Sequence, residues 1–387
     1  MGNGKALAGA ETADVVVVGG GVIGLSIARS LAVKGAGRVA LFERARPGAE
    51  ASFAAGGMLA PQAEANRADP FFELACASRD LYPEFARALC EETGVDIELE
   101  RTGTLYLAFT ENDEEELARR SRWQRRAGLL VEELSAEEAR RLEPCISTEV
   151  RSALRFPLDV QVENRLLVAA LTASIERHGV RLLAGINVGS VVVERGQVEG
   201  VETSGGRFSA PVVIVAGGAW TSQVRLAGAR SVQPVRVEPV RGQMLCFEAR
   251  PRLARHVIYS PRGYIVPRMD GRLLAGSTTE RAGFDKSVTA EGVALIKRHA
   301  AEIAPALRAL PLADSWAGLR PRTADELPVL GAAADVRGLY YATGHYRNGI
   351  LLAPLTGELV AEQVLTGRSA PLMEAFSPDR FDFARTI

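Results

Sequence analysis

Three glycines and one glutamate near the start of the chain have the types and the spacing of a nucleotide-binding site. Gly19, Gly21 and Gly24 follow a G-x-G-x-x-G pattern inside the segment DVVVVGGGVIG, residues 14–24. In this pattern the first glycine makes a tight turn, the second lets a pyrophosphate approach the backbone, and the third lets a helix pack closely on a strand. Glu43 follows about twenty residues later and has the oxygens to accept hydrogen bonds from ribose hydroxyls.

The elements expected around these residues support that interpretation. Residues 15–18 are a run of valines, which is typical of a buried parallel strand. Residues 22–34 have apolar side chains at helical spacing, so the free N–H groups at the start of this helix are expected to face phosphates. A second strand at 39–42 leads to the glutamate. The alternative is a tight turn that binds nothing, and the motif does not choose between NAD and FAD.

Length and composition predict a globular protein of two domains. The chain has 387 residues, of which 47% are hydrophobic and 24% charged, and its net charge is −1. This balance argues against nucleic acid and against an anionic membrane surface as partners. Cysteines and histidines are scattered, which predicts neither a disulfide framework nor a metal site. No apolar run has the length of a spanning helix, residues 1–13 are interpreted as a flexible tail without a signal peptide, and a cytoplasmic protein is expected.

Rossmann-like pieces lie at the start, in the middle and at the end of the chain. A strand at 212–216 runs into a Gly-Gly turn, and a strand at 339–343 precedes a polar loop. Between them, residues 235–276 alternate with a period of two, which predicts a large antiparallel sheet. Ser135 and Glu138 form a capping box. Further helices are expected at 70–93, 111–127, 163–178, 289–303 and 350–365, and further strands at 97–100, 104–109, 180–183, 188–193 and 198–203.

The segment ASFAAGGMLAP at 51–61 is too apolar for a solvated linker and too rich in glycine for a helix. A backbone with such small side chains suits close approach to a flat ligand, so a loop beside the ligand is expected here. The bland alternative is a tightly packed turn.

Several longer segments together resemble one enzyme family. They are VVVVGGGVIGLSIA with FER at 42–44, AAGGMLAP at 54–61, VVIVAGGAW at 212–220, GYIVPR at 263–268, WAGLRPRT at 316–323 and YATGHYRNGILLAPLTGELVA at 340–361. With these segments the chain resembles, over nearly its whole length, the FAD-dependent family of D-amino acid oxidase and sarcosine oxidase, and within it the glycine oxidases of thiamine biosynthesis.

The resemblance implies an α/β fold with a Rossmann-like FAD-binding domain and a second, β-rich α+β substrate domain, both discontinuous in sequence. The FAD-binding domain is expected to comprise residues 14–60, 150–228 and 322–370. The substrate domain is expected to comprise residues 61–149 and 229–321. Because residues 317–325 contain no cysteine to attach the flavin, FAD is expected to bind non-covalently.

The resemblance also assigns residues to the cofactor. It places the adenosine ribose on Glu43, the flavin beside residues 52–58, the adenine edge on the backbone of Val188, and the pyrimidine end of the flavin in the loop 345–349. A helix that begins there would stabilise negative charge on the flavin through its dipole. The implied cofactor contacts are Gly19, Gly21, Val22, Ile23, Gly24, Glu43, Arg44, Ser52, Gly56, Gly57, Met58, Val188, Gly217, His345, Tyr346, Arg347, Asn348, Gly349 and Ile350.

Arg320, Tyr264 and Arg347 are the implied substrate residues. In the resemblance, Arg320 and Tyr264 bind the substrate carboxylate and Arg347 lies nearby. Arg320 ends the apolar segment SWAGLR, where a buried guanidinium would need an anionic partner, and its planar fork suits a carboxylate. From composition alone, an internal salt bridge or an exposed arginine is an equally good interpretation of Arg320. Tyr264 alone would be interpreted as a core residue.

The implied activity is oxidative deamination of glycine or another small amino acid, such as sarcosine or D-alanine. Hydride passes to FAD, molecular oxygen is the expected acceptor with release of hydrogen peroxide, and thiazole formation in thiamine biosynthesis is the expected purpose. The alternatives are a dehydrogenase of the same fold that uses a quinone or an electron carrier, and a nucleotide-binding protein without catalysis. A homo-oligomer is compatible with the sequence.

Arg262 precedes Tyr264 by two residues, so strand alternation puts both side chains on one face. One hypothesis is a second cation at the mouth of the substrate pocket, which would favour acidic D-amino acids. The other is an arginine that turns outward and pairs with a surface carboxylate.

Overall fold

The computed structural model describes residues 11–229 and 235–381. The glycine motif belongs to a central sheet in which neighbouring strands are parallel, apart from the antiparallel edge strand β20. In spatial order this sheet consists of β20 (Val329–Ala332), β21 (Leu339–Thr343), β13 (Val212–Val215), β2 (Val15–Val18), β3 (Val39–Glu43) and β9 (Arg181–Ala184).

Both faces of the central sheet are covered, which explains the uninterrupted run of valines. Val15 and Val17 pack into a core shared with helices, whereas Val16 and Val18 pack against a small second sheet. The helices of the first face are α1 (Val22–Val33), α4 (Pro70–Thr93), α7 (Asn164–Arg177) and α9 (Gly349–Thr366). The small sheet consists of β1 (Glu11–Thr12), β12 (Gly206–Ser209), β11 (Gln197–Thr203), β10 (Val188–Glu194) and β14 (Arg225–Ala227).

A large, mostly antiparallel sheet forms the other part of the molecule. One of its faces packs on α8 (Ala290–Ile303), and the other face turns toward the central sheet and its ligand side. In spatial order it consists of β19 (Leu312–Arg322), β15 (Glu238–Glu248), β18 (Arg272–Gly276), β17 (Gly263–Pro267), β16 (Val257–Ser260), β5 (Thr104–Ala108), β7 (Ser152–Phe156) and β6 (Glu132–Ser135). Its outer helices are α5 (Glu111–Arg126) and α6 (Ala136–Leu142).

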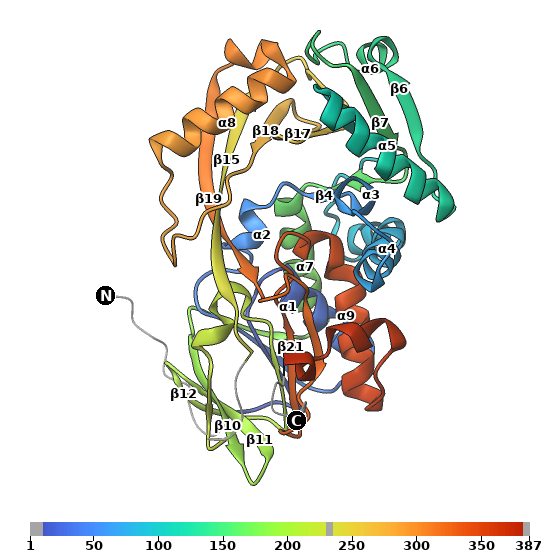
Figure 1. The fold of residues 1–387 in the computed structure, drawn as a ribbon. Coiled ribbons are helices and arrows are strands. Elements are labelled where there is room, and N and C mark those ends of the chain that lie inside the picture. Colours follow the sequence, from blue (N-terminus) through green and yellow to red (C-terminus); the bar gives the residue numbers. More distant parts are fainter. Residues whose placement is uncertain (1–10, 230–234, 382–387) are drawn as a thin grey trace.

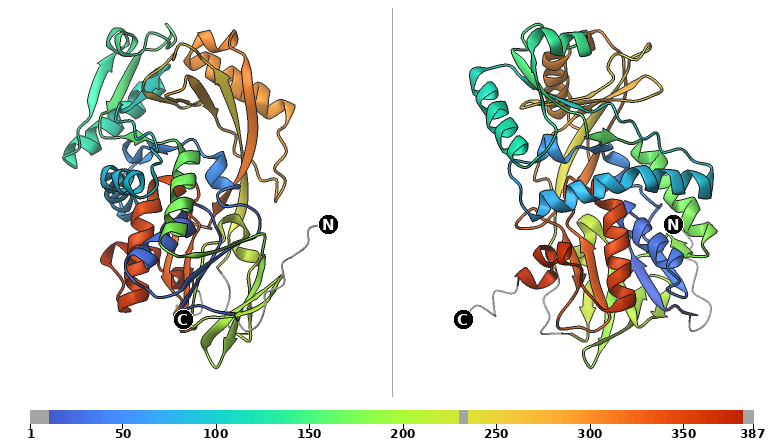
Figure 2. Two further views of the ribbon diagram at one scale, coloured as in Figure 1. Left: turned by 180° about the vertical axis from the view of Figure 1, so that it is seen from behind. Right: turned by 90° about the vertical axis from the view of Figure 1, so that its right-hand side faces the viewer.

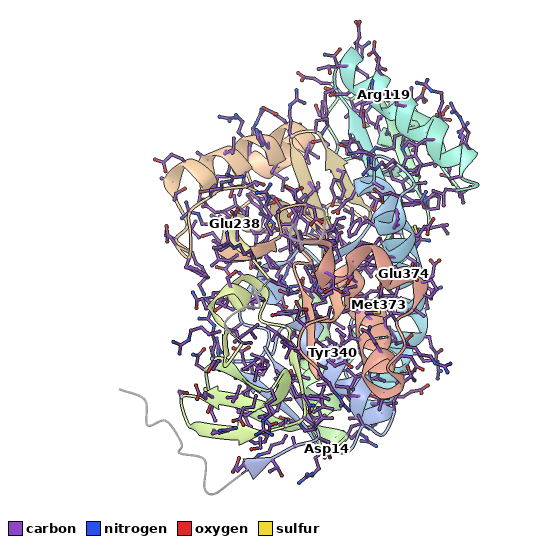
Figure 3. All side chains as sticks on the ribbon, turned by 60° about the horizontal axis from the view of Figure 1, so that its bottom comes forward. Asp14, Arg119, Glu238, Tyr340, Met373 and Glu374 are labelled. Carbon is purple, nitrogen blue, oxygen red and sulfur yellow. The ribbon has the colours of Figure 1, made fainter. Side chains whose placement is uncertain are left out.

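The two parts lie one above the other in Figure 1, and the long strands β15 and β19 reach from the upper part toward the lower. The side view in Figure 2 shows α4 crossing the molecule between them. Asp14 of the lower part and Arg119 of the upper part lie at opposite ends of the molecule (Figure 3). The expected fold class, a Rossmann-like domain with a β-rich second domain, is therefore confirmed.

Shorter elements connect these layers. Within the described ranges they are α2 (Ala51–Ala54), β4 (Met58–Leu59), α3 (Pro61–Glu64), β8 (Val160–Gln161) and the 3-10 helices η1 (Gly218–Gln223), η2 (Pro305–Arg308), η3 (Pro371–Phe376) and η4 (Pro378–Phe381). No helix in these ranges is long and apolar enough to cross a bilayer.

Two local expectations are wrong. Residues 51–61 are not one loop, because α2 packs closely on β19 and β4 pairs with β8, a strand about a hundred residues further on. Residues 97–100 form no strand in the described chain. The positive φ of Glu98, 53°, turns the backbone, and only Glu100 makes a bridge, to Gln161.

Two expected boundaries also change. β7 pairs with β5 and β6, so the substrate domain continues past residue 150, where the FAD-binding domain was expected to resume. The expected tail of residues 1–13 is too long, because residues 11–12 form β1 and pair with β12; residues 1–10 lie outside the described residues. Both differences arise from pairing with strands distant in the sequence, which local patterns do not encode.

Candidate functional site

A cavity of about 1130 Å³ joins the glycine motif of the central sheet to the inner face of the large sheet. Arg320 and Tyr264 line it from β19 and β17, and Arg347 lines it from the loop before α9. Of the nineteen residues expected at the cofactor, Gly24 alone does not line the cavity; the others do, namely Gly19, Gly21, Val22, Ile23, Glu43, Arg44, Ser52, Gly56, Gly57, Met58, Val188, Gly217, His345, Tyr346, Arg347, Asn348, Gly349 and Ile350.

The glycines of the motif have different physical reasons to be glycine. Gly19 has φ +113°, and a Cβ there would clash with the backbone of Ala216. A Cβ on Gly24 would clash with the carbonyl of Gly19, so Gly24 serves the packing of α1 on β2. Gly21 has φ −72°, and the nearest atom to a Cβ there, Ser52 Oγ, is at an ordinary 3.5 Å. No described residue occupies the space of a Cβ on Gly21, so this space is open to a ligand that approaches the backbone.

The residues around this motif suit a dinucleotide. α1 begins at Val22 and points its N-terminus, with its positive dipole, at the cavity. Glu43 accepts hydrogen bonds from the N–H groups of Gly20 and Ala45, both at 2.8 Å, which fixes its carboxylate at the end of β3. A carboxylate has lone pairs left for ribose hydroxyls after two such bonds. The donor and acceptor set therefore fits the phosphates and the ribose of a dinucleotide.

A second helix begins at the other end of the cavity. α9 starts at Gly349, directly after the loop 344–348, and its N-cap residue Asn348 makes no side-chain cap. His345 in this loop is buried, and burial lowers its pKa to about 3. The imidazole, whose Nε2 lies 3.2 Å from Thr356 Oγ1, is therefore neutral at working pH and adds no charge beside the N-terminus of α9.

The Arg320 side chain crosses β15 on the cavity face of the large sheet. Its guanidinium lies over Gly242, where any Cβ would collide with it. Beyond β15 it donates to Ser277 Oγ at 2.7 Å and to the carbonyl of Thr278 at 3.1 Å, at the end of β18. The side chain is thus held by uncharged acceptors across a strand that has room for it.

Within the described residues, Arg320 and Arg347 have no carboxylate within ion-pair distance, although both line the cavity. Burial lowers the pKa of Arg320 and the charge of Arg347 lowers it further, but a guanidinium stays protonated in proteins. Burial alone would lower the pKa of Arg347, but Tyr346 and Glu64 raise it. Two cations without a paired anion make this end of the cavity a site for an anion.

Tyr264 and Tyr259 form the aromatic wall beside Arg320. Their ring centroids are 5.5 Å apart, and Tyr106 stacks on Tyr259 at 6.0 Å. The Tyr264 hydroxyl donates to Met244 Sδ at 3.3 Å, and Tyr264 raises the pKa of Arg320 against the effect of burial. The three sequence-predicted substrate residues are therefore brought together, with Tyr259 and Tyr106 added by the fold.

Glu64 is a cavity residue that the sequence analysis missed. Its carboxylate accepts a 2.6 Å hydrogen bond from Tyr259 and interacts electrostatically with Arg347 and Arg320. Burial raises its pKa, although the hydrogen bond and the cations counteract this. No local signal marks Glu64, because it lies on the short helix α3 in an ordinary polar stretch.

Charged side chains hold α3, and with it Glu64, at both ends. Asp159 accepts hydrogen bonds from the N–H groups of Gln62 and Ala63, at 3.2 and 3.0 Å. Arg120 donates to the carbonyl of Ala63 at 2.8 Å at the other end. The Asp159 carboxyl satisfies two N–H groups at the start of the helical turn and the Arg120 guanidinium satisfies a carbonyl at its end, so a very short helix is kept in place.

Arg262 pairs with a carboxylate of the protein, as the second hypothesis on this residue stated. Its Nε is 3.0 Å from Glu302 on α8, and its guanidinium lies 4.8 Å from the ring centroid of Phe109. It reaches the rim of the cavity, but its charge is paired there. Over the described ranges, no three His, Cys, Asp or Glu side chains converge as metal ligands.

Known proteins are similar to this chain in sequence and in architecture. Residues 14–363 match the family described as DAO, FAD dependent oxidoreductase. A glycine oxidase from Geobacillus kaustophilus is 40% identical over 95% of this chain and 97% of its own length. A bifunctional ThiO/ThiG protein from Synechocystis is 36% identical over 96% of this chain, which spans only 54% of that relative. The crystal structure of glycine oxidase from Geobacillus kaustophilus has a TM-score of 0.90 at 37% identity, and covers 95% of this chain and 98% of that one.

The contrast between Gly21 and Gly24 is testable. Gly24→Ala should lower the unfolding free energy of the apoprotein by on the order of 1–3 kcal/mol, because its Cβ overpacks the turn. Gly21→Ala should leave that stability nearly unchanged and weaken FAD binding by about tenfold or more, because its Cβ occupies the space of the pyrophosphate. Thermal unfolding of the apoprotein and fluorescence titration with FAD measure the two effects. A larger stability loss in Gly21→Ala than in Gly24→Ala would contradict this assignment.

Proposed function

Because this chain belongs to the DAO family of FAD-dependent oxidoreductases, we propose that it oxidises glycine or another small amino acid to the imino acid. One observation carries the proposal: Arg320, a partly buried guanidinium with no carboxylate of the described residues at ion-pair distance, lines the cavity that fits the cofactor. The substrate carboxylate is the anion that completes this site. The similarity to glycine oxidases supports a small amino acid as substrate.

Arg320, Tyr264 and Arg347 orient the substrate. The fork of Arg320 takes the carboxylate in a bidentate grip, and the Tyr264 hydroxyl adds a further hydrogen bond. Fixing the carboxylate fixes the direction of the adjacent Cα–H bond. Arg347 adds positive charge from the loop before α9, where its Nη2 donates to Thr279 Oγ1 at 3.2 Å, so the carboxylate meets cations from two elements of the fold.

The chemistry that FAD supplies when bound is acceptance of the hydride from the substrate carbon. The chain prepares the site for it through the two helix N-termini that face the cavity, at Val22 and Gly349, which favour negative charge on the phosphates and near the flavin. A neutral His345 adds no charge that would compete with them. The aromatic wall of Tyr106, Tyr259 and Tyr264 narrows the reacting end and limits access of water.

Glu64 is the group that we assign to the substrate amine. It carries negative charge at the same end of the cavity as two arginines, and Tyr259 holds its orientation through the 2.6 Å hydrogen bond. A zwitterionic amino acid presents a carboxylate and an ammonium group a few bonds apart. Cations for one and a carboxylate for the other complement that charge pattern, and the raised pKa of Glu64 suits acceptance of the proton that the amine must lose.

The acceptor and the biological role belong to this proposal as well. Molecular oxygen is the proposed acceptor, with hydrogen peroxide as product; a quinone or another carrier is the competing acceptor. The similarity to a ThiO/ThiG protein supports a role in thiazole formation for thiamine biosynthesis. A cytoplasmic location is proposed from the composition, and a homo-oligomer is a further proposal.

The purified holoenzyme should turn over glycine, sarcosine or D-alanine with hydrogen peroxide release and should keep FAD non-covalently. A substrate panel read in parallel by peroxide formation and by reduction of an artificial acceptor distinguishes oxidase from dehydrogenase. Acid precipitation should leave the yellow colour in the supernatant. Turnover with the artificial acceptor alone would overturn the oxidase, and colour that stays in the pellet would overturn non-covalent binding.

Removing the Arg320 guanidinium should lower both the affinity for the substrate and the rate of hydride transfer. Arg320→Ala should lose on the order of 2–5 kcal/mol in kcat/KM, because one partner of a buried charge pair is missing. Arg320→Lys should also be poor, since an ammonium cannot replace the planar fork. Steady-state kinetics at normal FAD content is the measurement. If Arg320→Ala retains near-normal kcat/KM, Arg320 does not bind the substrate.

The variant Glu64→Gln should distinguish recognition of the substrate amine from recognition of the substrate carboxylate. We expect kcat/KM for glycine to fall about ten- to a hundredfold, because a hydrogen bond to a charged group is lost. Binding of acetate, a carboxylate without an amine, should be unchanged or tighter. In Arg320→Ala the binding of both ligands should weaken. A Glu64→Gln enzyme whose acetate affinity falls in parallel with its glycine activity would refute the assignment to the amine.

A further inference from the structure

Residues 277–289 connect β18 to α8, and we call them the strap. At its start, Ser277 Oγ and the Thr278 carbonyl hold the Arg320 guanidinium on the cavity face of the large sheet. Beyond this start, residues 281–288 are exposed, apart from the partly exposed Ala282. Apolar burial therefore does not fix this part of the strap, and its polar contacts must do so.

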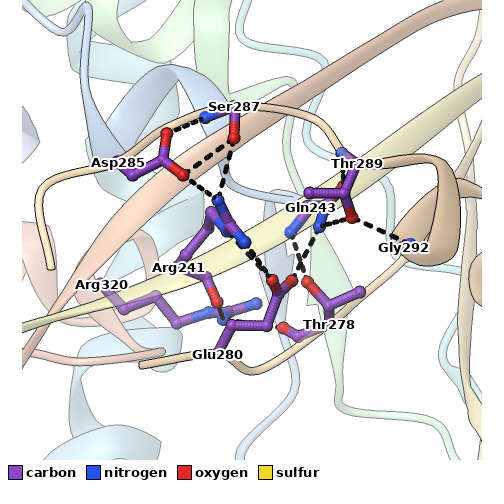
Figure 4. Close-up of polar contacts among 9 residues, drawn as sticks. All are labelled: Arg241, Gln243, Thr278, Glu280, Asp285, Ser287, Thr289, Gly292 and Arg320. Atoms are coloured by element: carbon purple, nitrogen blue, oxygen red, sulfur yellow. Dashed lines mark hydrogen bonds and ion pairs between the residues drawn. The ribbon is translucent and has the colours of Figure 1, made fainter. Parts of the chain in front are cut away.

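Arg241 makes most of these contacts from β15. Its side chain is only 7% exposed, and its Nε donates to Glu280 Oε2 at 3.0 Å while its Nη1 donates to Asp285 Oδ2 at 2.6 Å. Ser287 accepts from the same guanidinium at 3.1 Å and donates to Asp285 at 2.9 Å. One arginine thus binds the strap at three positions over eight residues (Figure 4).

Backbone hydrogen bonds join Arg241 to Glu280, close to Ser277 and Thr278, which hold Arg320. The N–H groups of Arg241 and Glu280 donate to each other's carbonyls, at 2.9 and 3.0 Å. The carbonyl of Arg241 is also 3.5 Å from Arg320 Nη1. Since side chains alternate along β15, Arg241 points away from the cavity while Gly242 leaves room for Arg320 on the cavity face.

Gln243 continues the same arrangement two residues along β15. Its backbone N–H donates to Thr278 Oγ1 at 2.9 Å, and its side chain donates to Glu280 Oε1 at 2.8 Å. Its Oε1 accepts from the N–H of Thr289, the N-cap of α8, at 2.8 Å. Both ends of the strap are therefore fastened to the strand that Arg320 crosses.

The middle of the strap reaches the cofactor side of the cavity. Lys286 Nζ is 2.8 Å from Glu50, and the ring of Phe284 lies 5.6 Å from Trp220, a residue that lines the cavity near Arg44. The strap thus spans from the substrate grip to the adenosine end of the cavity. A shift of the strap would move Ser277 and Thr278, the acceptors of Arg320.

We propose that Arg241 is a positioning residue for the reaction: its ion pairs with Glu280 and Asp285 fix the strap, and the strap orients Arg320 for the substrate carboxylate. The inference rests on the proposed function only in naming that carboxylate as the anion. Arg241 does not touch the substrate in this scheme. Its effect on anion binding passes through the strap to Arg320 and, because Arg347 Nη2 donates to Thr279 Oγ1 at 3.2 Å, also to Arg347. A double-mutant cycle with Arg320 is the measurement that separates this positioning from a general loss of stability.

The experiment measures acetate binding to the FAD-loaded holoenzyme, by flavin absorbance or calorimetry, and KM against kcat for glycine. Arg241→Gln should weaken acetate binding on the order of ten- to a hundredfold, as expected when a binding group is displaced by about 1 Å. Asp285→Asn, an exposed change that removes one of the two ion pairs, should have a smaller effect in the same direction. In the Arg320→Ala background, the further effect of Arg241→Gln should be clearly smaller, because only the contact of the strap with Arg347 remains.

Arg155→Gln is the matched control, because Arg155 forms a 2.9 Å ion pair with Glu132 elsewhere in the large sheet. It should leave acetate binding unchanged. Equal losses from Arg241→Gln with and without Arg320, or no loss from either Arg241→Gln or Asp285→Asn, would overturn the inference. If Arg241→Gln does not fold, the same double-mutant cycle with Arg320→Ala is measured with Asp285→Asn instead, and its result decides the inference. Since acetate binding requires no turnover, absent glycine oxidation would refute the proposed function without touching this result.

Discussion

The rest of this site depends on one constraint: the positive charge of Arg320 has no carboxylate at ion-pair distance among the described residues. Arg320 is partly buried and permanently protonated, and its hydrogen-bond acceptors are uncharged, so the folded protein carries part of the cost of that charge until an anion binds. A salt bridge inside the protein would have been more stable and would have closed the site. Leaving the guanidinium unpaired keeps the free energy of charge pairing available for a substrate carboxylate.

Glycines make the geometry around that charge and around the cofactor. Gly242 opens β15 so that Arg320 crosses it, and Gly276 leaves space for Met244 and the Tyr264 hydroxyl. Gly19 and Gly24 permit the tight turn between β2 and α1, whereas Gly21 leaves its space to a ligand. A missing side chain is here a positive structural feature, because each one admits a specific neighbour that any Cβ would displace.

The two parts of the molecule supply different halves of the chemistry. The central sheet provides helix N-termini and a carboxylate for a charged cofactor, and the large sheet provides the arginine and the tyrosines for a small substrate. Glu64 enters from α3, which Asp159 and Arg120 keep in place from either end. The site is therefore assembled from segments that are far apart in the sequence, and contacts such as those of the strap must keep them in register.

The sequence by itself determined the elements around the glycine motif and the cofactor fold that they form. The spacing of Gly19, Gly21 and Gly24, the valine run and the helical pattern after it are local, and local sterics and hydrogen bonding decide a turn, a buried strand and a helix start. The capping box at Ser135 and the helix α9, which begins at Gly349, were predictable for the same reason. Arg320, Tyr264 and Arg347 followed from the resemblance of longer segments, since an arginine by itself says nothing about its partner.

Only the tertiary structure decided which charges are paired. Arg262 finds Glu302 on another element, and Arg241 finds Glu280 and Asp285, whereas Arg320 finds no carboxylate in the part of the chain described. It also decided that β7 joins the large sheet and that Glu64 faces the cavity. All of these outcomes have the same physical reason. The free energy of a charge or of an edge strand depends on partners that lie within a few ångströms of it. The fold brings these partners together from distant parts of the sequence, so no local sequence pattern encodes which residues will be close.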